Sequence, residues 1–342
     1  MSALGVFSIG GGPRRVGVKV GNEVAEAGMV STLLEGDSLL QLLEAGPDAW
    51  GEILANVNRA VPDLPRVPMA EVTMHLPCPI GDYVDFYSSL HHAENVGRIF
   101  RPESEPLPPN WRHLPVGYHG RSGTIKVDGT SIPRPRGQRA QGDFGPSQRL
   151  DFELEMGFIT GAGPGEIPVT EAEDYIFGLV LVNDWSARDI QAWEYQPLGP
   201  FLGKSFATTI SPWVVPLRDL SDRRIEVSNQ EPMPLQYLMP PGAGIDLDLE
   251  VRVNGDVISR SNLRHLYWTM SQLLAHATSN SATIRAGDLF ASGTISGPTD
   301  DSLGCLLEIT KGQGPFLEDG DRVEFTAGVE DFGTCSGTIT PG

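Results

Sequence analysis

The sequence predicts a mainly β fold with a few helices, divided into two parts, and three observations support this prediction. Glycine and proline account for 40 and 28 of the 342 residues, a composition that favours turns between short elements. Most apolar segments late in the chain are short and separated by glycine-rich turns. The proline-rich segment 61–68 precedes a change of pattern, so we expect a small domain over residues 1–77 and a larger one over residues 78–342.

The small N-terminal part begins with alternating apolar stretches in residues 4–20, which predict a hairpin that turns at three consecutive glycines. A phosphate-binding loop is the alternative for these glycines, but no Gly-Lys-Ser/Thr sequence follows them. Apolar residues in the segment 38–57 predict two short helices, broken at Gly46 and Pro47. We expect residues 61–68 to form a linker.

The larger part begins its predictable structure at residues 150–158, where apolar and acidic residues alternate as in a strand. Thr170 with Glu173 three positions later predicts a capping box that opens a short helix. The apolar run 178–184 predicts a buried strand that ends in an aspartate.

Residues 263–274 have the apolar spacing of an amphipathic helix, with Ser261 or Asn262 as its cap. Three later segments are predicted to be strands joined by glycine-rich turns: 289–297, 305–310 and 321–328.

The formal net charge of −19 argues against nucleic acid and anionic membrane surfaces as partners, because both would repel the chain. The three cysteines, Cys78, Cys305 and Cys335, are widely spaced, which predicts neither a disulfide framework nor a thiolate zinc site. The N-terminus lacks the order of a signal peptide, and no apolar run approaches the ~20 residues of a membrane span. We therefore expect a cytoplasmic protein that acts on a small molecule.

Four carboxylates are candidates for a metal site. Glu153 and Glu155 project from one strand face, which by default is a solvated face. Asp184 stands where a buried strand ends, and Asp85 lies among aromatic residues rather than among other charges. Carboxylates without cysteine or a histidine pair suit a hard cation, Mg²⁺ or Ca²⁺, better than zinc.

Donor side chains form the other candidate clusters. Of the adjacent His91 and His92, only one can face a given site on a helix. Arg101 with Tyr87 and Tyr118 could bind a substrate carboxylate, although each is equally explained by packing or surface exposure.

A cluster of donors follows Asp184 along the chain: Arg188, Gln191, Tyr195 and Lys204. Cations and amides of this kind can build an oxyanion pocket beside a metal. Their spacing alone does not prove that they converge.

Several longer strings carry a resemblance: DFYSS, HLPVGYHGR, NDWSARDIQ, WEY, PLGPFLGKSF and ASGTISGP, with LDFELEM and LLE in the expected order. From about Cys78 to the C-terminus, the sequence thereby resembles the fumarylacetoacetate hydrolase family. The segment before Cys78 carries none of these motifs, and Leu90 and His91 depart from the family pattern, whereas His92 keeps its spacing from Asp85 and Arg101.

The resemblance implies a small SH3-like N-terminal barrel followed by a β-roll catalytic domain, usually as a homodimer. It implies metal ligands at Asp85, Glu153, Glu155 and Asp184, with Lys204 and Thr208 near the cation. It implies a catalytic His92 oriented by Glu308, and an oxyanion pocket of Arg188, Gln191 and Lys204. Substrate-binding positions would be Tyr87, Arg101, Tyr118, Gln191, Tyr195 and Thr294.

The reaction implied by the resemblance is hydrolysis of the C–C bond of 4-fumarylacetoacetate to fumarate and acetoacetate, a late step of tyrosine and phenylalanine breakdown. An acylpyruvate hydrolase or decarboxylase would share the four carboxylates but not the long strings NDWSARDIQ and PLGPFLGKSF. A non-catalytic cation- or metabolite-binding protein is the other alternative. Such a protein would need no general base, so the presence of both His92 and Glu308 favours an enzyme.

Overall fold

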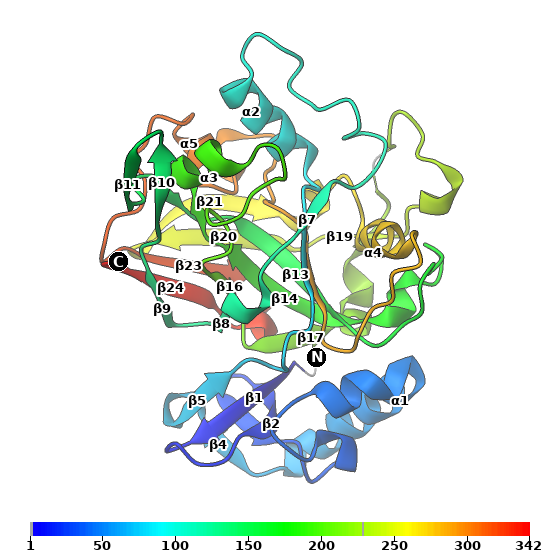
Figure 1. The fold of residues 1–342 in the computed structure, drawn as a ribbon. Coiled ribbons are helices and arrows are strands. Elements are labelled where there is room, and N and C mark those ends of the chain that lie inside the picture. Colours follow the sequence, from blue (N-terminus) through cyan, green and yellow to red (C-terminus); the bar gives the residue numbers. More distant parts are fainter. Residues whose placement is uncertain (1–2, 228) are drawn as a thin grey trace.

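The computed structural model describes residues 3–227 and 229–342, and two β-sheets occupy its centre (Figure 1). The larger sheet has 13 strands within the described residues, ten of them along one path. In spatial order these are β4 (Arg66–Pro68), β3 (Glu23–Glu26), β2 (Arg15–Val20), β1 (Leu4–Ile9), β17 (Trp213–Pro216), β14 (Ile176–Asp184), β13 (Leu154–Thr160), β22 (Leu289–Ala291), β6 (Tyr83–Phe86) and β7 (Gly117–His119). Off this path, β5 (Val72–His75) pairs with β1, β16 (Thr208–Ile210) pairs with β14, and β8 (Ile125–Val127) pairs with β16.

The second sheet has five strands, in the order β21 (Asp256–Asn262), β20 (Asp248–Val253), β23 (Arg322–Ala327), β24 (Cys335–Thr340) and β9 (Thr130–Pro133). Three short pairs complete the strands: β10 (Arg136–Ala140) with β11 (Asp143–Pro146), β12 (Leu150–Asp151) with β15 (Ser186–Ala187), and β18 (Arg224–Ile225) with β19 (Gly244–Ile245). The α-helices are α1 (Leu40–Ala60), α2 (Leu90–Phe100), α3 (Arg188–Glu194), α4 (Met270–Thr278) and α5 (Leu306–Ile309). The predicted mainly β class is therefore confirmed.

The N-terminal part lies below the rest of the molecule in Figure 1 and is joined to it by sheet pairing and by packing. The predicted hairpin is β1 paired with β2. The helix α1 turns at Gly46, whose φ of 82° is accessible mainly to glycine, so two helical segments form as predicted. Trp50 of α1 packs edge-on against Phe177 of β14, with ring centroids 5.3 Å apart. The two parts thus share one apolar core.

The predicted linker at residues 61–68 is wrong, because Val61–Asp63 forms a 3-10 helix and a strand follows it. Arg66–Pro68 forms β4, which pairs with β3 and places Val67 opposite Val24. A strand at the edge of a sheet tolerates proline, because one side of it needs no hydrogen-bond donor. Proline richness therefore marked a sheet edge here rather than a free connection.

Three further predictions are wrong about where a helix begins or whether a helix forms. The capping box at Thr170 does not form, and a 3-10 helix begins at Ala172 without a side-chain cap. The helix predicted over residues 263–274 divides into a 3-10 turn capped by Asn262 and the separate helix α4, which has its own capping box at Thr269 and Gln272. Residues 305–310, predicted as a strand, contain the short helix α5.

The buried strands β13 and β14 form the centre of the larger sheet. Every residue of both strands is buried, and the two are antiparallel neighbours. The strand predicted over residues 150–158 is interrupted, because β12 ends at Asp151 and β13 starts at Leu154. The predicted buried strand that ends at Asp184 is confirmed as β14. These central strands carry two of the acidic side chains described below, Glu155 and Asp184.

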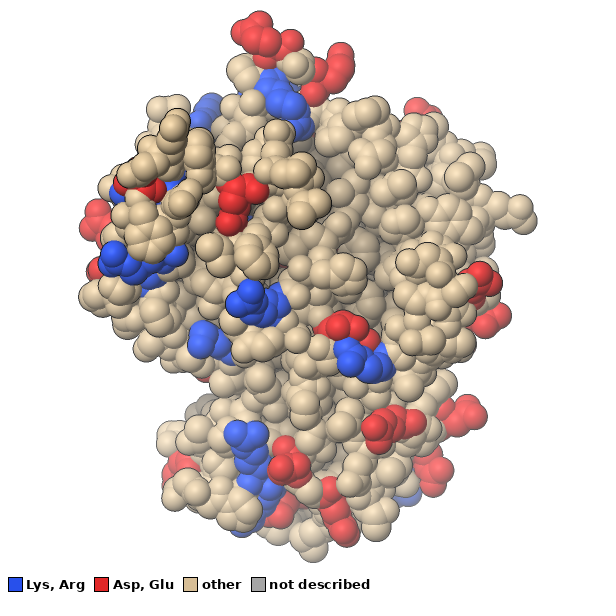
Figure 2. Space-filling model, in the orientation of Figure 1, with Lys and Arg blue, Asp and Glu red and all other residues tan. Residues whose placement is uncertain are grey.

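Charged side chains are scattered over the face of the molecule shown in Figure 2, with lysines and arginines interspersed among acidic and uncharged residues. Within the described residues, no helix is long and apolar enough to span a bilayer. Cys78, Cys305 and Cys335 are all buried free thiols.

Candidate active site

Four buried carboxylates converge in the centre of the larger sheet. Asp85, Glu153, Glu155 and Asp184 each place an oxygen within 4.8 Å of the others. The alternative interpretation of Glu153 and Glu155 as part of a solvated sheet face is wrong, because both side chains are buried. We call this group the carboxylate cluster.

Sheet register explains why residues distant in sequence meet here. Ala291 of β22 pairs with Asp85 of β6 on one side and with Gly157 of β13 on the other. The strand that carries Asp85 and the strand that carries Glu155 therefore flank β22. Asp184 ends the neighbouring strand β14, opposite Thr208 of β16. Strand pairing therefore brings the acidic side chains together from three directions.

Cations neutralise only part of the carboxylate cluster. Lys204 Nζ donates to Glu153 Oε2 at 2.6 Å and to Asp184 Oδ2 at 2.8 Å, and Arg188 Nη1 donates to Glu153 Oε1 at 2.7 Å. Burial alone would raise the pKa of Glu153, but Lys204 and Arg188 together hold this pKa below its ordinary value. Glu153 is therefore the well-compensated member of the cluster.

Asp85 and Glu155 have the opposite environment. Asp85 Oδ1 and Glu155 Oε1 are buried and have no hydrogen-bond donor among the described residues. Burial, followed by the charge of Asp184, raises the pKa of Asp85, and burial, followed by the charge of Asp85, raises that of Glu155. Buried polar atoms without partners are costly, so the site lacks positive charge at these two oxygens.

The donor set fits a hard divalent cation. Such cations prefer carboxylate oxygens, and the two unpaired oxygens are the atoms left for a ligand to satisfy. Lys204 and Thr208, predicted to lie near the cation, both contact Asp184, with Thr208 Oγ1 at 3.1 Å from Asp184 Oδ1. The arrangement can bind a metal without any thiolate or imidazole.

Tyrosine hydroxyls border the carboxylate cluster. Tyr118 lies opposite Asp85 across the β6–β7 pair, and its hydroxyl is 3.1 Å from Asp85 Oδ2 and 2.7 Å from Asp184 Oδ2. A phenol carries one proton and can donate to only one of them at a time. Burial, together with Asp184, raises the pKa of Tyr118 and keeps the hydroxyl protonated. Tyr83 adds a donor to Asp85 at 3.2 Å.

A buried histidine–carboxylate pair is the second part of the site. His92 lies in the first turn of α2, capped by Ser89, and its Nδ1 is 2.6 Å from Glu308 Oε2 on α5. Figure 1 shows these two helices at the same end of the molecule. Glu308 also accepts from Asn95 at 2.9 Å and Ser296 at 2.7 Å.

These contacts fix the protonation of the pair. Burial acts to raise the pKa of Glu308, but His92 and the hydrogen bonds to the carboxylate lower it to about 2. An ionised Glu308 accepts the proton of His92 Nδ1, so Nε2 is the nitrogen left to accept one. Only His92 of the two adjacent histidines contacts Glu308, because His91 instead packs against His265 with ring centroids 6.0 Å apart.

Arg188 and Gln191 lie between the two parts of the site. Both belong to α3, and Gln191 Oε1 accepts from Arg188 Nη1 at 3.3 Å. Arg188 Nε binds Asp151 Oδ2 at 2.9 Å, whereas its buried Nη2 has no partner among the described residues. Arg188 and Lys204 thus both contact Glu153, and Gln191 contacts Arg188. The three predicted oxyanion donors therefore lie close together.

The predicted substrate-binding residues do not all meet. Tyr87 packs edge-on against His92 with ring centroids 5.3 Å apart, and the buried hydroxyl of Thr294 has no hydrogen-bond partner among the described residues. Arg101 is exposed and donates to the carbonyl of Pro106, and Tyr195 is 45% exposed. The structure therefore leaves Arg101 and Tyr195 at the surface.

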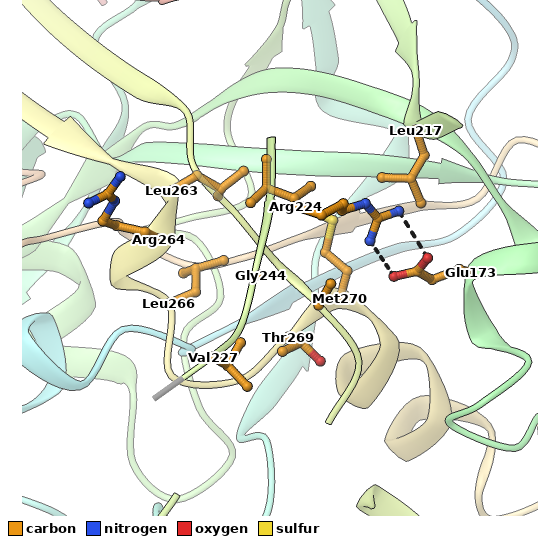
Figure 3. A pocket seen from close by; sticks show the side chains of 12 residues that line it. Glu173, Leu217, Arg224, Val227, Gly244, Leu263, Arg264, Leu266, Thr269 and Met270 are labelled. Carbon is orange, nitrogen blue, oxygen red and sulfur yellow. Dashed lines mark hydrogen bonds and ion pairs between the residues drawn. The ribbon is translucent and has the colours of Figure 1, made fainter. Parts of the chain in front are cut away.

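A cavity of about 200 Å³ reaches the carboxylate cluster from outside, since Tyr118 and Lys204 line it together with Arg121 and Phe201. A different cavity, shown in Figure 3, lies beside the ion pair of Glu173 with Arg224 and is otherwise mainly apolar. Its volume of about 20 Å³ holds little more than a water molecule. The cavity in Figure 3 contains none of the predicted site residues, so it is not the place for a substrate.

Several contributing residues were missed by sequence reasoning. Asn95 stands three residues after His92 on α2, a spacing that could have indicated a shared helix face. Ser296 and Tyr83 gave no local signal, because their roles depend on strand packing. Asp151 belongs to the alternating segment 150–158, and that pattern gives it no role different from the other acidic residues.

Sequence comparisons find relatives that cover nearly the whole chain. The family described as Fumarylacetoacetate (FAA) hydrolase C-terminal matches residues 83–340. A fumarylacetoacetase of Oryza sativa subsp. japonica is 44% identical over 399 residues, covering 99% of this chain and 93% of that protein. The Homo sapiens fumarylacetoacetase is 42% identical over 395 residues, covering 98% and 94%.

Solved structures show the same fold at lower identity. The fumarylacetoacetate hydrolase of Exiguobacterium antarcticum has a TM-score of 0.68 at 19% identity and full coverage of both chains. A maleylpyruvate hydrolase of Sphingobium sp. SYK-6, solved with manganese(II) and pyruvate, has a TM-score of 0.63 at 18% identity, covering 99% of each chain.

Fold and sequence similarity together define the class of protein, which is a hydrolase. The chain belongs to the fumarylacetoacetate hydrolase family.

Proposed function

We propose that this protein hydrolyses 4-fumarylacetoacetate to fumarate and acetoacetate and serves tyrosine and phenylalanine breakdown. The observation that carries the proposal is the position of the incompletely neutralised carboxylate cluster beside a buried His92–Glu308 pair. Relatives that are named fumarylacetoacetase and match nearly the whole chain support the choice of substrate.

We propose Mg²⁺ or Ca²⁺ as the cofactor, held by Asp85, Glu153, Glu155 and Asp184 with Lys204 and Thr208 beside them. When bound, such a cation supplies Lewis-acid polarisation of the oxygens of a diketo substrate. The unpaired oxygens of Asp85 and Glu155 support this assignment.

His92 is proposed to act as the general base. Glu308 Oε2 accepts the proton of Nδ1, with the two atoms 2.6 Å apart, so Nε2 can remove a proton from the water that attacks the fumaryl-side carbonyl. Because the carboxylate remains ionised, it also stabilises the imidazolium that results from this transfer.

Arg188, Gln191 and Lys204 are proposed to stabilise the tetrahedral oxyanion. The unpaired Nη2 of Arg188 is a free donor. The carbonyl oxygen of Gln191 accepts from Arg188, which leaves its amide group to donate. Lys204 uses its ammonium toward Glu153 and Asp184 and retains a third N–H. Donors that are already held in place stabilise developing charge with little rearrangement.

Substrate binding is proposed for Tyr87, Arg101, Tyr118, Gln191, Tyr195 and Thr294. Support is strongest for Tyr87, Tyr118 and Thr294, which lie beside His92 or the carboxylate cluster or are buried with an unpaired hydroxyl. Arg101 would have to leave the carbonyl of Pro106 to reach a substrate carboxylate. The roles of Arg101 and Tyr195 therefore rest on the family resemblance.

The remaining features of the protein are also proposals. We propose that residues 1–77 form an SH3-like domain and residues 78–342 the catalytic domain, in a cytoplasmic homodimer. The exposed apolar side chains between residues 193 and 202, among them Leu198 at 97% exposure, support an interface between copies.

The function is tested by adding purified protein and Mg²⁺ to fumarylacetoacetate and recording the loss of its conjugated ultraviolet absorbance, with product analysis for fumarate and acetoacetate. Acylpyruvates serve as the competing substrates. We expect the highest kcat/KM for fumarylacetoacetate. A higher kcat/KM for an acylpyruvate would assign the protein to the related hydrolases, and binding without turnover would assign it to metabolite-binding proteins.

A further inference from the structure

Asp151 is a fully buried carboxylate that contacts both Arg188 and the helix α5. It ends β12, next to the break before β13. It is not a member of the carboxylate cluster. Both of its oxygens accept hydrogen bonds from other elements.

One set of contacts connects Asp151 to the helix α5. Oδ1 accepts from the backbone N–H of Leu306 at 2.8 Å, and Oδ2 accepts from that of Leu307 at 3.0 Å. The first N–H groups of a helix have no partner within the helix, and the N-cap residue Cys305 supplies no side-chain bond. Asp151 thus caps α5 from a distant strand.

The cap matters because Glu308 directly follows Leu307 in α5. A helix of four residues has little stability of its own, so its orientation depends on such contacts. The position of the carboxylate that holds His92 is therefore set in part by Asp151.

A second contact connects Asp151 to Arg188, with Nε donating to Oδ2 at 2.9 Å. Nη1 of the same guanidinium is held by Glu153 and Gln191, and Nη2 stays unpaired. Because the guanidinium is planar, fixing Nε and Nη1 also fixes the direction of Nη2.

We propose that Asp151 is a positioning residue that holds the general-base pair His92–Glu308 and the oxyanion donor Arg188 in one geometry. The inference rests on the proposed function, because it assigns Asp151 an effect on groups whose catalytic roles are proposed above. Asp151 acts through these groups and does not touch the substrate.

The test is Asp151→Asn, which keeps the size of the side chain but replaces one accepting oxygen with an N–H donor facing other donors. We expect kcat for fumarylacetoacetate to fall about 10²-fold, while KM and the Mg²⁺ dissociation constant change by less than about threefold. Unchanged kcat in a folded protein, or an equal loss in Mg²⁺ affinity, would overturn the proposal.

Asp288→Asn is the matched control. Asp288 is also buried, accepts backbone N–H bonds from Asp82 at 2.6 Å and Arg285 at 2.8 Å, and pairs with the Arg285 guanidinium. We expect this variant to melt at a lower temperature yet keep kcat within about threefold of wild type. An equal loss of kcat in both variants would reduce Asp151 to a purely structural residue.

A double-mutant comparison separates positioning from general destabilisation. If Asp151 acts through Glu308, then Asp151→Asn in a Glu308→Gln background should lower kcat much less than the 10²-fold expected in the wild-type background. Full additivity of the two losses would contradict the proposal.

A spectroscopic readout distinguishes failure of this inference from failure of the proposed function. In ¹⁵N-histidine-labelled protein, the short Nδ1–H bond of His92 to Glu308 should give a downfield proton resonance that shifts or broadens in Asp151→Asn but not in Asp288→Asn. This readout needs no substrate. If Asp151→Asn does not fold, Arg188→Lys, which removes the guanidinium partner of Asp151, should still move the resonance, and an unmoved resonance would contradict the proposal.

Discussion

The carboxylate cluster and the His92–Glu308 pair are both buried and acidic, yet they differ in how completely the protein satisfies them. Glu308 accepts hydrogen bonds from His92, Asn95 and Ser296, and its pKa is lowered to about 2. Asp85 and Glu155 each retain a buried oxygen without a donor, and their pKa values are raised, first by burial and then by neighbouring carboxylates.

This difference shows which part of the site finds all its hydrogen-bond partners within the protein. The histidine–glutamate pair already has its partners and can serve as a preorganised base. The carboxylate cluster needs a further positive charge, which a divalent cation would supply. The predictions below test whether the two regions respond to mutation in these opposite ways.

The largest expected effect is the loss of the base. His92→Ala should lower kcat by about 10²-fold or more, because the variant lacks Nε2, the atom proposed to accept the proton from water. Cation affinity should be retained, since His92 lies outside the carboxylate cluster. Steady-state kinetics with circular dichroism as the folding control measure both properties, and near-normal kcat would remove His92 from the mechanism.

The same substitution should have opposite effects on stability in the two regions. Without cation, Glu155→Gln should raise the free energy of unfolding by about 1 kcal/mol. The reason is that an amide N–H donor replaces Oε1, a buried oxygen that accepts no hydrogen bond from the described residues. Glu308→Gln should lower it by about 1–3 kcal/mol, because the charged acceptor of hydrogen bonds from His92, Asn95, Ser296 and Cys305 is lost. Urea unfolding of the metal-free proteins measures both free energies. Changes of the same sign in the two variants would contradict the difference between the two regions.

The smallest expected effect is a loss of folding stability at acidic pH. Folding lowers the pKa of Glu308 from 4.5 to about 2, so its contribution to stability is present above the unfolded pKa and is lost as the pH falls between these values. Between about pH 5 and pH 3.5, wild type should lose about 1 kcal/mol that Glu308→Gln does not lose. Unfolding free energies measured across this range should therefore converge for the two proteins, and parallel curves would contradict the lowered pKa.

Much of the fold followed from local patterns. The hairpin β1–β2, the break of α1 at Gly46 and the strand that ends at Asp184 were each predicted from spacing and turn residues. Errors arose where distant parts decide the local structure. Residues 305–310 are apolar enough for a strand, but Asp151 caps them as the helix α5.

The candidate site was predictable to different degrees. Same-face spacing pointed to Glu153 and Glu155, and Asp85 was a candidate from its aromatic surroundings, whereas the family resemblance was needed for Glu308, which joins the site through helix packing. The separate role of Asp151 was hidden, because the interruption between β12 and β13 breaks the alternation that the sequence suggests.

The central claim is that the carboxylate cluster needs a divalent cation whereas the His92–Glu308 pair does not. Isothermal titration calorimetry of Mg²⁺ and Ca²⁺ into EDTA-stripped protein measures this most directly, with wild type, Glu155→Gln and Glu308→Gln as the matched set. We expect about one cation per chain in wild type and Glu308→Gln, and at least about tenfold weaker binding in Glu155→Gln, which lacks one anionic ligand. Equal affinity in Glu155→Gln, or no binding to wild type, would contradict the account.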